Sequence, residues 1–533
     1  MSSLHRAERL ILAHLWTSFA SFGAAAVLGF WQMWVRSPIP APFNAPSRYF
    51  ASVTAHGTTM AYAVTTFFAV GFGYTIAVSA LDEPLVSRRW AWAGFWIMLL
   101  GEVTMLAPVL AGKASVLYTF YPPLTADVWF YVGLVALFGG SWIWAVLMIR
   151  QMACWKRMHA GVPVPLAMFA ITATAWLWLW TGVGVGSEIV FQILPHALGW
   201  RLRVDPGLAR VLFSLTLHAI TYFWLLPAYI AYYVFVPAAA GGRLYSDVLA
   251  RVAFIMFLLF SVPTGMHHLM MDPQVPPAFK FLQTVLTAMV VAPTLLTIFT
   301  IGASIEIGGR LRGGQGRIGW VQALPWERPM MLGAALSLML LGLGGFGGLV
   351  NMSYAMNALV HNTVWVTAHF HLILGGATIL MYFAIAYEIW PELTGRSFSS
   401  SRRVRWQLLL WAAGVLITTV PWHVAGLLGE PRRVAQFDYA DPAVARWAGL
   451  TVISLVGAAV MLVAAMFFVV NLIALGPRTR DTTIRYSVAL NPPGTVPSYL
   501  NGFLVWNLLL LVVTVLAYSV PLGRYLFPWH GGT

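Results

Sequence analysis

The sequence predicts an all-α integral membrane protein, a polytopic bundle of about thirteen transmembrane helices. Of its 533 residues, 59% are hydrophobic and 9% are charged, whereas a soluble domain of average make-up carries roughly 25% charged residues. Apolar runs long enough to cross a bilayer recur to the end of the chain. The net charge of +14 lies in the loops between these runs, which indicates membrane topology rather than binding to nucleic acid. Soluble, fibrous and disordered classes are excluded.

The elements follow from the apolar runs in order. The first run begins at residue 9 and has no small-residue cleavage site behind a short apolar core, so we interpret it as a span rather than a signal peptide. Stretches rich in Pro, Gly or Arg separate later runs. No linker is long enough to divide soluble domains, so residues 1–533 are expected to form a single integral-membrane catalytic domain. The expected spans are 9–34, 49–79, 90–112, 128–149, 163–196, 209–237, 248–271, 280–305, 329–350, 354–388, 404–428, 446–474 and 500–522.

The distribution of basic residues predicts the orientation in the membrane. Thirteen crossings place the two chain ends on opposite sides. With the N-terminus inside, the inner segments hold 20 of the 31 Lys and Arg residues. The positive-inside rule then predicts a cytoplasmic N-terminus and an outward C-terminus, in the cell membrane of a prokaryote.

Six of the 13 histidines lie within apolar spans. Because the chain has one cysteine, Cys154, any redox metal that it holds alone must be bound by histidine. Ionisable residues inside a membrane are costly and are functional candidates by default. A single membrane histidine can also serve as a helix-to-helix hydrogen bond, but that role does not require the common depth that the topology gives to all six, in the outer half of the bilayer. They are His56, His218, His267, His268, His369 and His371.

The spacing of these histidines indicates two kinds of metal site. His369 and His371 are two residues apart on a helix, so their side chains point about 200° apart and can serve cofactors on both faces. His56 with His371 would complete a six-coordinate haem, whereas His369 alone would leave a haem iron with an open position.

The remaining three histidines suit a small ion beside that open position. His267 and His268 are adjacent, which provides two ligands for one ion, and His218 adds a third. Neutral imidazole suits copper, so we interpret the three as a copper site. Tyr222 lies four residues after His218, on the same helix face.

This constellation resembles subunit I of the haem–copper oxidase superfamily over essentially the whole chain. The usual His-Pro-x-x-Tyr of the B branch reads His218-Ala219-Ile220-Thr221-Tyr222 here, and the Glu of the A branch is missing from the motif. The details are similar to the b-plus-a-haem cytochrome c oxidase of thermophiles. The segments that carry the resemblance are TAHGTTMAY (54–62), VLYTFYPPL (116–124), HAITYFWLLPAY (218–229), GMHHLMMDP (265–273), SIEIGGRLRGG (304–314), LVHNTVWVTAHFHL (359–372) and HVAGLLGEPRR (423–433).

The resemblance implies a role for each histidine. His56 and His371 would hold a low-spin haem b, and His369 a high-spin a-type haem. The three others would hold one copper ion, and Tyr222 would be the tyrosine joined covalently to the ring of His218.

The resemblance also implies that an outer loop holds the haem propionates. Arg432 and Arg433 match the family's propionate-binding pair, and arginine forks carboxylates well. His361 would lie near the other propionates. Asn357 stands where the family generally has Asp, so the chain departs from the pattern on the exit side for protons.

The implied function is that of the catalytic subunit of a terminal oxidase, which reduces dioxygen to water with electrons from the low-spin haem and couples this to proton uptake and pumping. The chain lacks the Cys pair and Met of a dinuclear copper site, so an outward-facing cupredoxin-like subunit II is expected to carry one. A small single-helix subunit is a further expected partner. The donor would be a cytochrome c, a blue-copper protein or a quinol.

Two other functions compete with this interpretation. A nitric oxide reductase of the same superfamily tends to lose the tyrosine and to gain acidic residues near a non-haem metal, but Tyr222 is present and no Glu occurs in 209–237 or 248–271. A proton-coupled transporter has no use for six histidines at one depth.

Protons for an outer-half site must cross apolar helices, which requires polar side chains. Tyr229 and Tyr233 follow Tyr222 at spacings of seven and four, so all three share one helix face. Hydroxyls in membrane helices also commonly bond their own backbone. The joint placement resembles the one-channel pattern of the B branch, whose lowest acidic residue comes from the partner subunit. The other expected path residues are Thr294, Thr297, Thr300, Ser141 and Ser246.

Overall fold

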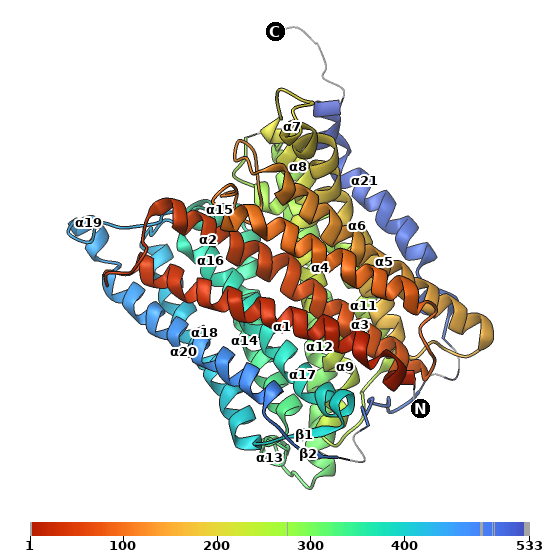
Figure 1. Ribbon diagram of the computed structural model, residues 1–533. Helices are drawn as coiled ribbons and strands as arrows, with labels where there is room; N and C mark the ends of the chain where they lie inside the picture. Colours follow the sequence, from red (N-terminus) through yellow and green to blue (C-terminus); the bar gives the residue numbers. More distant parts are fainter. Residues whose placement is uncertain (1–2, 274, 480–482, 493, 495, 527–533) are drawn as a thin grey trace.

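The computed structural model describes residues 3–273, 275–479, 483–492, 494 and 496–526, and these form a bundle of long helices (Figure 1). The α-helices are α1 (Ser3–Arg36), α2 (Pro46–Thr58), α3 (Thr65–Leu81), α4 (Arg88–Leu110), α5 (Val128–Met158), α6 (Leu166–Glu188), α7 (Leu194–Ala197), α8 (Pro206–Leu217), α9 (Ala219–Val234), α10 (Val236–Ala239), α11 (Asp247–Ser261), α12 (Pro277–Leu311), α13 (Gly319–Gln322), α14 (Pro329–Met352), α15 (Tyr354–Val360), α16 (Val364–Phe370), α17 (Ile379–Thr394), α18 (Ser401–Leu427), α19 (Pro442–Ala445), α20 (Ala448–Ile473) and α21 (Leu504–Leu526). The other elements are the π-helical segments η1 (Thr59–Val64), η2 (Ile189–Ile193) and η4 (His371–Thr378), the 3-10 segments η3 (Gly265–Leu269) and η5 (Ser498–Leu500), and the antiparallel strands β1 (Arg396–Phe398) and β2 (Leu475–Arg478).

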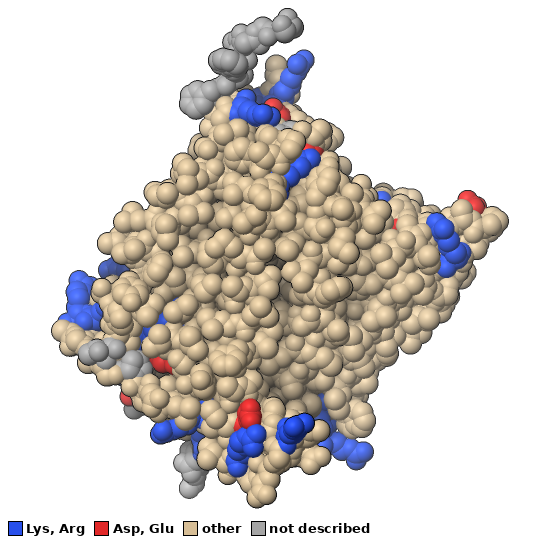
Figure 2. Space-filling view, turned by 180° about the vertical axis from the view of Figure 1, so that it is seen from behind, with Lys and Arg blue, Asp and Glu red and all other residues tan. Residues whose placement is uncertain are grey.

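Twelve helical segments of the described chain are long and apolar enough to cross a membrane. They confirm the predicted fold class. The expected span 248–271 is the one that is not among the twelve: it consists of the 15-residue helix α11 and the short turn η3. Pro263 and Gly265 account for the break, because proline lacks an amide proton and glycine is a poor helix former. The surface in Figure 2 agrees with a membrane protein, since a broad face without charged side chains separates groups of Lys and Arg at its ends.

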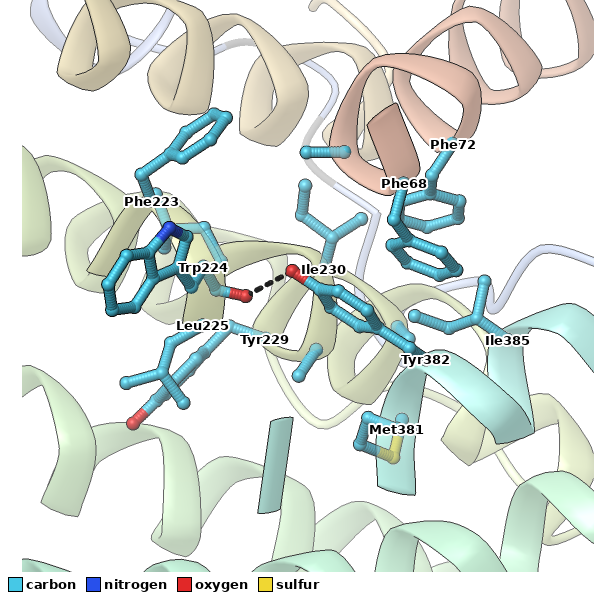
Figure 3. Close-up of a cluster of buried hydrophobic side chains, with 14 of the residues drawn as sticks. Phe68, Phe72, Phe223, Trp224, Leu225, Tyr229, Ile230, Met381, Tyr382 and Ile385 are labelled. Carbon is cyan, nitrogen blue, oxygen red and sulfur yellow. Dashed lines mark hydrogen bonds between the residues drawn. The ribbon is translucent and has the colours of Figure 1, made fainter. Parts of the chain in front are cut away.

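An aromatic cluster packs three of the membrane helices together at the centre (Figure 3). The rings of Phe68 on α3 and Tyr382 on α17 are stacked, with centroids 3.7 Å apart. The Tyr382 hydroxyl donates a hydrogen bond of 2.7 Å to the carbonyl of Trp224 on α9. Because α3, α9 and α17 each continue a helix that carries a candidate histidine, this cluster fixes the positions of those histidines relative to one another.

Candidate metal centre

His56 and His371 face each other with the geometry of two axial ligands. Their ring centroids are 6.4 Å apart and their planes differ by 11°. An imidazole nitrogen lies roughly 2 Å from a bound metal and just over 1 Å from its ring centre, so an ion between two rings separates their centres by roughly 6.3 Å. The two residues therefore fit a six-coordinate haem iron.

Hydrogen bonds orient both rings for that role. The Nδ1 atom of His56 donates to the carbonyl of Ala25 on α1, and that of His371 donates to the carbonyl of Thr367, each at 2.8 Å. A proton held on Nδ1 leaves Nε2 as the free electron pair. Gly29 on α1 allows this close approach, because an added Cβ there would lie 2.9 Å from Cε1 of His56.

The second group consists of the three histidines expected to bind copper. The ligand atoms of His218, His267 and His268 all lie within 4.8 Å of one another. Nε2 of His218 is buried and has no hydrogen-bond partner in the described part of the chain. Nδ1 of His267 donates to the carbonyl of Thr264 at 2.6 Å, which leaves its Nε2 for a metal. His267 is buried, His218 is half-buried and His268 is exposed. Three neutral imidazoles with free nitrogens this close together fit one copper ion.

The short segment η3 carries two of these histidines against helix α8. Gly265 contacts α8 so closely that an added Cβ would lie 1.6 Å from the carbonyl oxygen of Ser214. The side chain of Gln283 on α12 is buried and donates to the carbonyl of Pro263 at 2.9 Å. It also accepts the backbone N–H of Met266 at 3.2 Å. The contacts with α8 and α12 hold the pair of histidines beside His218.

Helix geometry is interrupted at the third histidine. α8 ends at Leu217 and α9 begins at Ala219, so His218 stands between two helices. The helix is interrupted here even though this chain has Ala219 where the family usually has Pro. The rings of His218 and Tyr222 have centroids 5.1 Å apart and are tilted by 56°. Tyr222 thus lies beside the candidate copper site, as its spacing of four residues predicts.

His369 lies near the three histidines of the candidate copper site. It interacts electrostatically with both His218 and His268. Gly347 on α14 leaves space for its ring, because an added Cβ would lie 2.5 Å from Nδ1 of His369. A π-helical segment begins two residues later, at His371, and such segments are frequent at functional sites. One helix therefore presents histidines to two neighbouring sites.

The loop after α18 holds a half-buried guanidinium, that of Arg432, which lacks a full set of partners. Burial, and next the positive charge of Arg433, lower the pKa of Arg432 to about 10. The Nε atom of Arg432 is buried without a hydrogen-bond partner among the described residues. Such a group fits a carboxylate ligand, so Arg432 matches the chemistry of a haem propionate. The backbone N–H of Arg432 donates to the carbonyl of Asn362 at 3.1 Å, which ties this loop to the start of α16.

An ion pair that the sequence analysis did not identify supports this loop. Arg36 and Glu430 are both buried and approach to 2.5 Å. Arg36 also donates to the carbonyl of Arg432 at 3.2 Å. The signal in the sequence is weak: Glu430 is a charged residue directly before Pro-Arg-Arg, but nothing local points to Arg36 as its partner.

His361 lies beside the same arginines. Partial burial, and then the charges of Arg432, Arg210 and Arg433, lower the pKa of His361 to about 4. His361 is therefore neutral near pH 7. The oxygen of Asn357 lies 3.1 Å from Nδ1 of His361, so the amide at this position occupies the place where a carboxylate would pair with the ring.

The candidate proton path is a ladder of hydroxyl contacts between α9 and α12. The hydroxyl of Tyr229 lies 3.1 Å from that of Thr294. Tyr233 donates to the Thr297 hydroxyl at 2.8 Å. Thr300 interacts electrostatically with Tyr233 and donates to its own helix. The two hydroxyl pairs and Thr300 lie along the contact between α9 and α12.

The other two expected path residues have different surroundings. Ser246 caps α11 by accepting the N–H of Leu249 at 3.2 Å. Ser141 donates to the carbonyl of Phe138 and accepts a hydrogen bond from Trp178, so its hydroxyl is bonded to α5 and α6 rather than to the α9 tyrosines. Ser304, which the sequence analysis did not identify, lies one turn beyond Thr300 on α12 and is buried.

The arrangement fits one class of protein, a membrane-embedded redox centre: one histidine pair suits the axial positions of a haem iron, and a three-histidine group suits copper. The sequence profile of the family described as "Cytochrome C and Quinol oxidase polypeptide I" matches residues 9–460. "Cytochrome c oxidase subunit 1" of Thermus thermophilus is 36% identical over 492 residues, covering 89% of this chain and 86% of the relative. The protein of that description from Thermostichus vulcanus is 24% identical over 447 residues, covering 81% and 76%.

A solved structure agrees with these sequence matches. A cryo-EM structure of a "heme-copper terminal oxidase dimer" superposes with a TM-score of 0.91 at 32% identity, covering 97% of this chain and 92% of that chain. The chain belongs to the haem–copper oxidase subunit I family. It is the catalytic subunit of a terminal respiratory oxidase, a proton-pumping and oxygen-reducing membrane enzyme that uses haem and copper and works with partner subunits.

Proposed function

We propose that the chain is a B-branch oxidase subunit with a low-spin haem b between His56 and His371, a high-spin a-type haem on His369 and one copper ion on the other three histidines. The observation that carries this proposal is the presence of two separate histidine sets. One pair of rings lies 6.4 Å apart, and a group of three gathers its ligand atoms within 4.8 Å. When bound, the haem–copper pair supplies electrons to dioxygen.

Other side chains around the metals bind the haem propionates or supply protons. Arg432 and Arg433 orient the propionates, with neutral His361 beside them. Tyr222, next to His218, gives its proton to the reacting oxygen and is joined to the ring of His218. The hydroxyls of Tyr229, Tyr233 and the α12 threonines Thr294, Thr297 and Thr300 supply protons to Tyr222 from the cytoplasmic side. Ser141 and Ser246 are further candidates for this path.

The proposed setting is the cell membrane of a prokaryote, with a cytoplasmic N-terminus and an outward C-terminus. An outward cupredoxin-like subunit II with a dinuclear copper site delivers electrons from a cytochrome c or a blue-copper protein, and a small single-helix subunit completes the complex. The distribution of Lys and Arg and the lack of a Cys pair in this chain support this arrangement.

The purified complex offers a direct test. We expect extraction to give one b-type and one a-type haem, and we expect the complex to consume dioxygen when a cytochrome c or a blue-copper protein is the donor. Nitric oxide consumption without dioxygen consumption, or two haems of the same type, would contradict the proposal.

A further inference from the structure

Glu188 is a buried carboxyl group that the metal sites do not use. It is the last residue of α6, its side chain is 0% exposed, and neither carboxyl oxygen has a hydrogen-bond partner in the described chain. The π-helical segment η2 begins at the next residue, and such segments are frequent at functional sites. An unpaired carboxylate inside a membrane is costly, so a group placed like this is held as a neutral acid or has a role in proton transfer.

Two further polar groups near Glu188 also lack protein partners. They are Nε2 of Gln192, four residues further along the chain, and the hydroxyl of Tyr121, which interacts electrostatically with Glu188. Glu188 has the same kind of interaction with Tyr62 and Tyr131. Buried polar groups of this kind normally bond to ordered water. Glu188, Gln192 and Tyr121 therefore define a small polar cluster that suits water.

This polar cluster borders the helix that leads to the copper histidines. Gly184, one turn before Glu188, is so close to α8 that an added Cβ would lie 2.5 Å from the carbonyl oxygen of Leu212. The N–H of Val185 donates to the Thr216 hydroxyl at 2.8 Å, two residues before His218. The cluster is therefore adjacent to the metal centre without supplying a ligand to it.

The other side of the polar cluster reaches the outer arginines. The guanidinium of Arg210 lies 5.4 Å from the ring centre of Tyr121, and its Nε is buried without a partner among the residues described. Arg432 interacts electrostatically with both Tyr121 and Arg210. The cluster thus extends from a carboxyl group inside the membrane to the positive charges that border the propionate site.

The other acidic side chains near these arginines are already paired. Glu430 binds Arg36, and Asp272 binds Arg210 at 2.9 Å. Asn357 is an amide and cannot carry a proton as a carboxyl group does. Of these carboxyl groups, Glu188 is therefore the one that has no protein partner among the described residues.

We propose that Glu188 is held as a neutral carboxylic acid and, during turnover, gives its proton to ordered water bound by Gln192 and Tyr121. The proton leaves the carboxyl oxygen for a bound water, which becomes a hydronium ion, and the acid is restored when a proton returns from that water. The inference rests on the proposed oxidase function, because turnover of the haem–copper pair supplies the changes of charge that drive the release.

The test compares Glu188→Gln with wild type in the intact complex, reconstituted into phospholipid vesicles. Glu102→Gln is the matched control, since Glu102 is another buried membrane carboxyl group but is bonded to Ser21 at 2.6 Å. Two quantities are measured: protons ejected per dioxygen consumed, and the carbonyl stretch of protonated carboxyl groups in the reduced-minus-oxidised infrared spectrum.

We expect Glu188→Gln to lose a carboxyl band that wild type and Glu102→Gln retain. We also expect this variant to eject at most roughly half as many protons per dioxygen as wild type. Tyr121→Phe should keep the band at a shifted frequency and eject fewer protons. An unchanged band or an unchanged ejection ratio in Glu188→Gln, with haem spectra intact, would refute the inference. A wild-type complex that does not reduce dioxygen would refute the proposed function instead.

Discussion

The substitution Thr297→Val tests the proposed proton path most sharply. Tyr233 is buried, and its hydroxyl donates to Thr297 at 2.8 Å. Valine has nearly the size of threonine but no hydroxyl, so the helix keeps its packing while Tyr233 loses its acceptor. The Thr297 hydroxyl also donates to the carbonyl of Pro293, and helix geometry compensates for that loss.

The size of the effect follows from the hydrogen bond that is lost. A buried polar group left without a partner costs about 1–3 kcal/mol. If this cost falls on the proton-transfer step, and each 1.36 kcal/mol is a factor of ten in rate, oxygen reduction slows by about one order of magnitude.

The assay is steady-state oxygen consumption by the purified complex, with haem content and the fully reduced spectrum as checks on integrity. Thr284→Val is the control, because Thr284 lies on the same helix and donates to the carbonyl of Lys280 rather than to a tyrosine. We expect wild-type turnover from the control and wild-type spectra from both variants. Wild-type turnover in Thr297→Val and also in Tyr229→Phe would show that protons enter elsewhere.

Three further predictions concern the metal sites. His267→Ala should remove copper while both haems stay, and full copper occupancy by metal analysis would mean that the histidine pair is structural. His56→Ala should abolish the low-spin haem spectrum, and a retained low-spin signal would overturn its assignment as a ligand. Arg432→Leu removes a positive charge beside the proposed propionates and should lower the midpoint potential of a haem by on the order of tens of millivolts. Redox titration checks this, and an unchanged potential for both haems would place the propionates elsewhere.

The histidines could be predicted because their signal is local. An ionisable side chain in an apolar run is visible in the sequence, and helix geometry fixes that His369 and His371 point to opposite faces. Tyr229 and Tyr233 are visible for the same reason, because spacings of seven and four residues keep them in line with Tyr222.

The remaining features depend on contacts between distant segments. Arg36 and Glu430 are 394 residues apart in sequence, so neither shows that the other neutralises it. Ser141 suits a proton path by depth, but the partner of its hydroxyl is Trp178 on another helix. The lack of a hydrogen-bond partner for Glu188 cannot be recognised in the sequence, because it depends on the positions of all the helices that surround this residue.

The binding of carbon monoxide to the fully reduced complex tests the central claim most directly. In the proposed arrangement, His56 and His371 occupy both axial positions of one haem, whereas the haem on His369 keeps an open position next to the three-histidine group. We therefore predict that carbon monoxide shifts the absorbance of one haem and leaves that of the other unchanged. Binding to both haems, or to neither, would contradict the assignment of the six histidines.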